Sequence, residues 1–433
     1  MRCTPRRRRA LRCLVAVLVA AGLTLVAVSC ADLDGREVRS DAARATPDQR
    51  AVAPTVESLN AFAADLHRQL ALRGGNVAVS PYAVAISLAQ ARLGAAGPTR
   101  DELNRLLHTG PGSELDDGLN TLRSALAQRN GERASDVRRG SIELRAAGSL
   151  WVQLDTDPRS SLLDDLARYY ETGLHSADFR SDPDRARRII DRWADSATGG
   201  QVTQLLPKGS ISEFTRFVVP SVASLRAPWK TRFDPQRTRL APFTTVDGRT
   251  VEVPTMSTAG PNGFAMGRGP GWEALAVPYL GDELAMILVV PDQGAFDAVE
   301  QSLDGEALGR VIDGLRPANV ELEMPRFHVA GTIDLEQPLV ALGLRSAFTD
   351  GADFSGVTGD EELSISRTVH QTAVGADEQG SDGDAVTVLR PSPASPPAVA
   401  PRTVSVDRPF LFLVVDRQTR LVLQMGRVVD PSG

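Results

Sequence analysis

The stretch that decides the fold lies near the C-terminus, where residues 377–401 read DEQGSDGDAVTVLRPSPASPPAVAP and residues 404–415 read VSVDRPFLFLVV. The first part is acidic and Gly-rich and then rich in Pro, Ser and Ala, a composition typical of linkers and domain boundaries. The second part is a strongly strand-like apolar run. Because too little chain follows it to form a second domain, the pattern indicates a long exposed loop between the last strands of one domain.

The remaining sequence predicts helices mainly in the first half and strands mainly in the second. Residues 54–74 carry Leu59, Phe62, Leu66 and Leu70 on one helical face, and residues 183–200 predict an amphipathic helix with a double-glycine stop. Strand signals fill residues 284–294 and 319–335, and residues 240–256 predict a hairpin around Asp247–Gly248. Because the two kinds of element are segregated rather than alternating, the order favours an α+β fold.

Composition and motifs give little support for an enzyme. The chain has 433 residues, 42% of them hydrophobic, and a formal net charge of −6, which provides no electrostatic case for nucleic acid or an anionic membrane. It has no nucleophile elbow, zincin motif, P-loop or dinucleotide fingerprint, and its five histidines lack ligand spacing. We therefore expect a protein that is not an enzyme and that binds no cofactor and no metal. The alternative is a hydrolase whose catalytic residues carry no recognisable motif.

The N-terminus predicts export. Residues 1–30, MRCTPRRRRALRCLVAVLVAAGLTLVAVSC, place a basic segment before an apolar stretch and end in AVSC, which resembles a lipoprotein cleavage box with Cys30 as the lipidated first residue. The alternative is an uncleaved anchor with an incidental Cys30. Either way, we expect an exported domain that is extracellular or held at the cell surface. Residues 31–53 are polar and aperiodic and predict a flexible tether.

From about Thr55 to Pro431 the chain resembles a serpin. Several segments follow one another in the order that is usual for that family. They are NVAVSPYAVAISLAQARLGAAGPTRDEL (76–103), TGGQVTQLLPKGSISEFTRFVVPSVASLRAPWKTRFDP (198–235), VPYLGDELAMILVVPD (277–292), ADFSGVTGDEELSISRTVHQTAV (352–374), VSVDRPFLFLV (404–414) and MGRVVDP (425–431).

The resemblance implies a serpin fold over residues 54–433, with helices packed around three β-sheets and an exposed reactive-centre loop at about 377–403. It also implies the function, a serine protease inhibitor acting by suicide-substrate trapping. A target protease cuts the loop, forms a covalent acyl complex, and is carried along as the N-terminal part of the loop inserts into the main sheet. The resemblance implies a monomer that needs no cofactor and meets a membrane only through its lipid anchor.

The hinge of the loop must alternate small and solvent-facing residues if it is to insert as a strand. Counting from Gly380, one set is small and the other is mostly acidic, with Asp382 and Asp384; the alternative is a solvated acidic turn. Gly383 weakens a strand, the two acids would repel each other, and Pro391 and Pro393 should end insertion. We assign the hinge to Glu378, Gly380, Ser381, Gly383, Ala385 and Thr387.

The scissile bond has two candidates. Counting forward from the hinge by the family's spacing gives Ala394–Ser395, whereas counting back from residues 407–410 gives Ala398–Val399. Both place a small side chain before the cut, which suits the shallow primary pocket of an elastase- or subtilisin-like protease. The prolines and the unusual hinge support the alternative function, a non-inhibitory serpin-fold binding or substrate protein.

The resemblance also assigns a sheet-opening region to Ser80, His370 and Trp229. His370 is expected to form hydrogen bonds beneath the strands that separate, although a structural core histidine explains it equally well. Three positions depart from the usual pattern: Ala83 replaces a serine, and Ser221 and Gly148 stand where Asn is typical. The opening mechanism is therefore expected to be altered.

Overall fold

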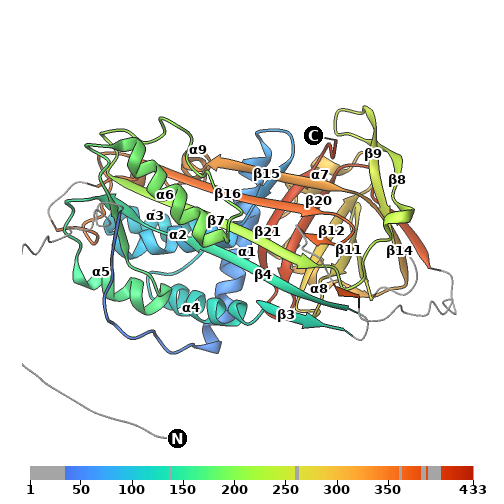
Figure 1. Ribbon diagram of the computed structural model, residues 1–433, viewed down its shortest axis with the longest axis horizontal. Coiled ribbons are helices and arrows are strands. Elements are labelled where there is room, and N and C mark those ends of the chain that lie inside the picture. The colour runs from blue at the N-terminus through green and yellow to red at the C-terminus, as the bar shows by residue number, and fades with distance from the viewer. Residues whose placement is uncertain are drawn as a thin grey trace, which may run out of the picture. The chain divides into compact units, whose positions relative to one another are not determined.

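The computed structural model describes residues 35–135, 138–258, 263–359, 363–381, 387–388 and 401–432, with only the backbone at 387–388. Residues 34–433 form one compact unit, in which helices surround three β-sheets (Figure 1). The predicted α+β architecture, with helices packed around three β-sheets, is confirmed. None of the helices in these described ranges combines the length and apolarity needed to cross a bilayer.

The main sheet has ten strands and carries the hinge. Its two central strands, β7 and β16, run parallel and pair from Val218↔Arg367 to Ala223↔Thr372. The antiparallel strand β15 flanks β16, and β4 and β5 flank β7. The bounds are β1 Arg36–Val38, β3 Gly131–Ala134, β4 Arg138–Gly148, β5 Trp151–Gln153, β6 Leu174–Ala177, β7 Phe217–Pro228, β15 Phe327–Asp334, β16 Arg367–Ala376, β17 Gly380–Ser381 and β18 Thr387–Val388.

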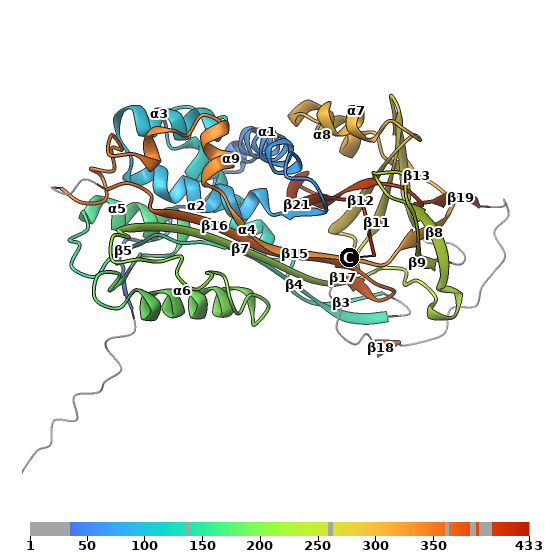
Figure 2. The same ribbon diagram turned by 90° about the horizontal axis from the view of Figure 1, so that it is seen from above.

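The two faces of this sheet are covered by different helices (Figure 2). On one face α6 (Pro183–Thr198) buries Ile189 and Ile190 against Val218 and Val222. On the other face α2 (Pro81–Gly94) packs against β4 and β7 within the larger core. Because side chains alternate along a strand, even-numbered residues of β7 face α6 and odd-numbered residues such as Leu225 face the larger core.

The other two sheets contain the strongest strand signals of the sequence. In the seven-stranded sheet β20 lies between β12 and β21 and is buried along its whole length, as its uninterrupted apolar run requires. The predicted hairpin is β8–β9, where Gly248 adopts a positive φ of 81°. The bounds are β2 Val77–Val79, β10 Ala265–Gly269, β11 Trp272–Pro278, β12 Leu284–Pro291, β13 Arg316–Pro317, β20 Phe410–Asp416 and β21 Leu421–Val428 in one sheet, and β8 Arg239–Thr244, β9 Thr250–Ser257, β14 Val320–Pro325 and β19 Arg402–Ser405 in the four-stranded sheet.

The helices begin and end where the sequence provides caps. Asp182 accepts a hydrogen bond from the Arg185 backbone N–H at the start of α6, and Gly199 ends that helix in the left-handed conformation. The apolar stripe from Leu59 to Leu70 is the buried face of α1. The remaining bounds are α1 Val52–Ala71, α3 Gly97–Leu106, α4 Glu114–Ala127, α5 Ser160–Asp165, α7 Phe296–Gln301, α8 Gly305–Asp313 and α9 Glu336–Ala341.

The N-terminal segment differs from the predicted tether. Residues 36–38 form β1, which pairs with β6 at the edge of the main sheet, and Val52 already belongs to α1. Between them Arg44 forms an ion pair with Glu171 at 2.7 Å, and the Asp48 backbone N–H donates to the Thr121 hydroxyl. A sheet edge binds an incoming strand through backbone groups, so a polar segment without periodicity can still be fixed to the domain.

Candidate functional site

The chain reverses direction directly after β16. The Asp377 carboxylate accepts hydrogen bonds from the backbone N–H groups of Gln379 (2.7 Å) and Gly380 (3.0 Å), which closes a tight turn. β17 then pairs antiparallel with the end of β7, with Gly380 opposite Pro228. A Cβ at Gly380 would lie 2.1 Å from the Ala227 carbonyl oxygen, so only glycine allows this close approach.

β17 occupies the position of a new central strand. β7 and β16 pair only as far as Ala223 and Thr372, and beyond these residues β17 contacts both strands. Ser381 lies opposite Ala227 on the core-facing side, where its hydroxyl is 2.5 Å from the Tyr279 hydroxyl and both groups are buried. The main sheet is thus open at this end, with two residues of an added strand in place.

Glu378 fixes the turn to neighbouring elements. Its carboxylate is buried and accepts hydrogen bonds from the Arg326 guanidinium, one of them at 2.9 Å, and from the Thr238 hydroxyl at 2.5 Å. Burial alone would raise the pKa of the Glu378 carboxyl, but the hydrogen bonds from Arg326 and Thr238 outweigh it and hold the pKa below its usual value. Glu378 is therefore a charged anchor at neutral pH.

Trp229 holds the other side of the same turn. Its side chain is fully buried, its indole N–H donates to the Asp377 carbonyl at 2.8 Å, and its backbone N–H donates to the Gln379 carbonyl at 2.8 Å. The ring stacks on Tyr279 with centroids 4.5 Å apart. The structure therefore places Trp229 at the hinge, away from Ser80 and His370, with which it was grouped.

His370 and Ser80 meet beneath the paired part of β7 and β16. The buried His370 ring accepts a hydrogen bond from the Ser80 backbone N–H at 3.0 Å, and its other nitrogen lies 3.0 Å from the Ser221 hydroxyl. Burial lowers the pKa of His370 to about 3, so the ring is neutral. Ser221 thus keeps a bond to His370 although Asn was expected there. At Gly148 a Cβ would lie 2.6 Å from Ser87, so close packing on α2 requires glycine.

The loop itself is only partly described. Thr387 and Val388 form β18, which pairs with Arg139 and Arg138 of β4 rather than with β7, and the chain next returns as β19 beside β14. The other hinge residues and both candidate scissile bonds, together with the proposed lipidation site, lie outside the described residues: Gly383, Ala385, Ala394, Ser395, Ala398, Val399 and Cys30.

Sequence reasoning missed two of the residues that hold the hinge. Tyr279 follows β11, and Arg326 lies between β14 and β15, 52 positions before its partner Glu378. Neither carries a local signal, because each acts through a contact that only the folded topology creates. In the described ranges, no group of His, Cys, Asp and Glu side chains is arranged to hold a metal ion.

Comparison with known proteins agrees with this geometry. The family model described as Serpin (serine protease inhibitor) matches residues 57–431. An uncharacterized serpin-like protein of Thermococcus kodakarensis is 30% identical over 384 residues, covering 88% of this chain and 86% of that protein. The leukocyte elastase inhibitor of Bos taurus is 28% identical, covering 86% of this chain and 97% of its own length.

The fold is found again in a solved structure. The native state of tengpin, a thermophilic serpin, superimposes with a TM-score of 0.78 at 23% identity, covering 92% of this chain and 99% of that chain. The chain belongs to the serpin family. The family is one of protease inhibitors and not of enzymes, and its named inhibitors support protease inhibition as the general function of this protein.

Proposed function

We propose that this protein traps a serine protease as a suicide substrate, with the loop at 377–403 as the bait. The observation that carries the proposal is β17, which stands between the open ends of β7 and β16 and contacts both. After cleavage, the residues that follow Ser381 would continue this strand into the sheet. Each would gain backbone partners on two sides, which is the driving force for strand addition.

The pairing register supports insertion of this unusual hinge. Continuing from Ser381↔Ala227 places Asp382 opposite Arg226 and Gly383 opposite Leu225. Because Leu225 faces the core, the small set of hinge residues would be buried, as the alternation predicts. Asp382 would lie on the α6 side beside a cation, and an opposite-charge pair across two strands offsets the repulsion between the two loop acids.

The target class follows from the residue before the cut. Ala394 and Ala398 are both small, and one relative is named as an inhibitor of leukocyte elastase. We propose an elastase- or subtilisin-like protease and prefer Ala394–Ser395, with Ala398–Val399 as the alternative. We further propose that the protein is an exported monomer held at the cell surface through Cys30.

Mixing the protein with elastase, subtilisin and trypsin tests the proposal. A covalent complex that survives denaturing electrophoresis would support trapping, and the mass of the released peptide would locate the cut. Two matched variants separate the candidate bonds. If Ala394 precedes the cut, A394R should trap trypsin and no longer trap elastase, whereas A398R should behave like the wild type. Clean cleavage by every protease without a complex would refute trapping.

β18 favours a second candidate, a serpin-fold protein that does not inhibit. Its pairing with β4 keeps Thr387 away from Ser221, the residue it would face after full insertion. If that pairing persists after cleavage, the loop remains outside the sheet. Thermal unfolding before and after cleavage distinguishes the two, because insertion should raise the unfolding temperature by tens of degrees and a persistent β18 should leave it unchanged.

A further inference from the structure

The hairpin formed by β3 and β4 directs two arginines toward the same side of the main sheet. Ile142 of β4 is buried in the core, so the even-numbered residues of β4, including Arg138, face inward. Arg133 lies opposite Gly140 and therefore shares that face. The two arginines can be compared directly, because they differ in the partners that they find there.

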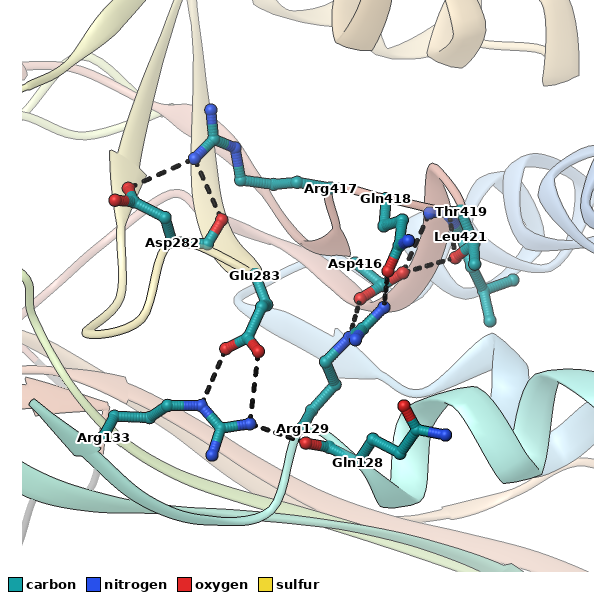
Figure 3. A network of polar contacts seen from close by, with 10 residues as sticks. All are labelled: Gln128, Arg129, Arg133, Asp282, Glu283, Asp416, Arg417, Gln418, Thr419 and Leu421. Carbon is teal, nitrogen blue, oxygen red and sulfur yellow. Dashed lines mark hydrogen bonds and ion pairs between the residues drawn. The ribbon is translucent and has the colours of Figure 1, made fainter.

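Arg133 has a complete set of partners. Its Nε and Nη2 groups donate to the two oxygens of Glu283 at 2.8 and 3.2 Å, and Nη2 also donates to the Gln128 carbonyl at 2.6 Å (Figure 3). This two-pronged pairing is the geometry in which a guanidinium binds a carboxylate best. Its charge is thus compensated by an acid.

Arg138 is more deeply buried than Arg133 and pairs with no acidic side chain in the part of the chain that the structure describes. The residue is 5% exposed, and its Nη1 group donates to the Trp229 carbonyl at 2.7 Å. Among the described residues, its Nε and Nη2 groups find no hydrogen-bond partner, and no carboxylate forms an ion pair with it. Burial and the neighbouring positive charge of Arg232 lower the pKa of Arg138.

A buried guanidinium without a counter-charge is unfavourable, because its desolvation is not compensated. Nε and Nη2 together form the edge that carboxylates, sulfate and phosphate bind with two parallel hydrogen bonds. We propose that this free edge of Arg138 is a binding site for a single oxyanion. The site adjoins the hinge through the backbone of Trp229. The Trp229 carbonyl accepts a hydrogen bond from Arg138, and the Trp229 backbone N–H donates to the Gln379 carbonyl. It does not depend on whether the protein inhibits a protease.

A sulfate titration of the intact protein tests the site, with chloride replaced so that ionic strength stays constant. In the wild type the apparent unfolding temperature should rise and then saturate, as expected for binding to the native state. R133Q, the matched control, should start from a lower temperature and keep the saturable rise. R138Q should keep only the gradual, unsaturable rise that sulfate causes by exclusion from protein surfaces. Equal responses of R138Q and the wild type would overturn the proposal.

One further variant covers the remaining outcome. R138K keeps the charge but loses the forked guanidinium, so its sulfate affinity should be at least about tenfold weaker even if R138Q fails to fold. Absence of saturation in the wild type would refute the site.

Discussion

Neutralising Glu378 should weaken the hinge by a measurable amount. In E378Q the side chain keeps its shape but loses the charge that receives the Arg326 and Thr238 hydrogen bonds. Hydrogen bonds to a charged group contribute about 1.5–3 kcal/mol each, but the Arg326 side chain is 46% exposed and its bonds are screened, so we expect a total of about 2–3 kcal/mol. With an unfolding entropy of about 2.1 cal/mol/K per residue over roughly 400 residues, the unfolding temperature should fall by about 3 °C.

Calorimetry of the uncleaved protein at neutral pH measures this change against a matched control. Glu323 pairs with Arg239 at 3.0 Å on the surface of the four-stranded sheet, where the Arg239 side chain is 60% exposed. E323Q should therefore cost less than about 1 kcal/mol, which is about 1 °C. If E378Q and E323Q shift the unfolding temperature equally, burial does not strengthen the Glu378 contacts and the reasoning fails.

Three other expectations concern the same region. The pKa of Glu378 is lowered on folding, so its stabilisation is complete above about pH 4.5 and disappears as the pH falls through the lowered pKa; acid unfolding curves of wild type and E378Q should converge there. R226Q should increase the fraction of cleaved but untrapped protein by up to about fivefold, since it removes a cross-strand counter-charge, whereas R145Q on the neighbouring strand should not; inhibition stoichiometry measures both. Y279F removes the partner of the buried Ser381 hydroxyl and should lower the free energy of unfolding by about 1–3 kcal/mol. The double variant Y279F/S381A should lose less unfolding free energy than the sum of the two single variants.

Patterns that belong to one element could be predicted from the sequence. The second half of the apolar run at 404–415 forms β20, because a strand buried on both faces needs no polar alternation, whereas its first two residues belong to β19 of another sheet. The buried stripe of α1 repeats with helical period. Parity alone decides which residues of a strand point inward, and Ser381, a member of the small set of the hinge, is buried in β17.

Contacts between distant segments could not be predicted. β1 is only three residues long, two of them charged, and it joins a sheet edge through its backbone, so no side-chain pattern predicts it. The Glu378–Arg326 pair joins residues 52 positions apart, and the unmatched Arg138 becomes evident only when its surroundings are known. Such features arise from topology, which brings together residues that are unremarkable on their own.

The pairing of β7 with β16 divides loop insertion into two regimes. If the loop inserts in the observed register, Asp382, Gly383 and Asp384 enter where the two strands are already apart and displace nothing. Ala385 is the first residue to arrive opposite Ala223, where it must break the pairing with Thr372 before it can make its own. Insertion would then proceed without breaking any strand pairing for three residues and would first have to break the β7–β16 pairing at the fourth. The rate of trapping would be governed by that step, so it should be sensitive to the strength of the β7–β16 pairing rather than to the protease that cuts the loop.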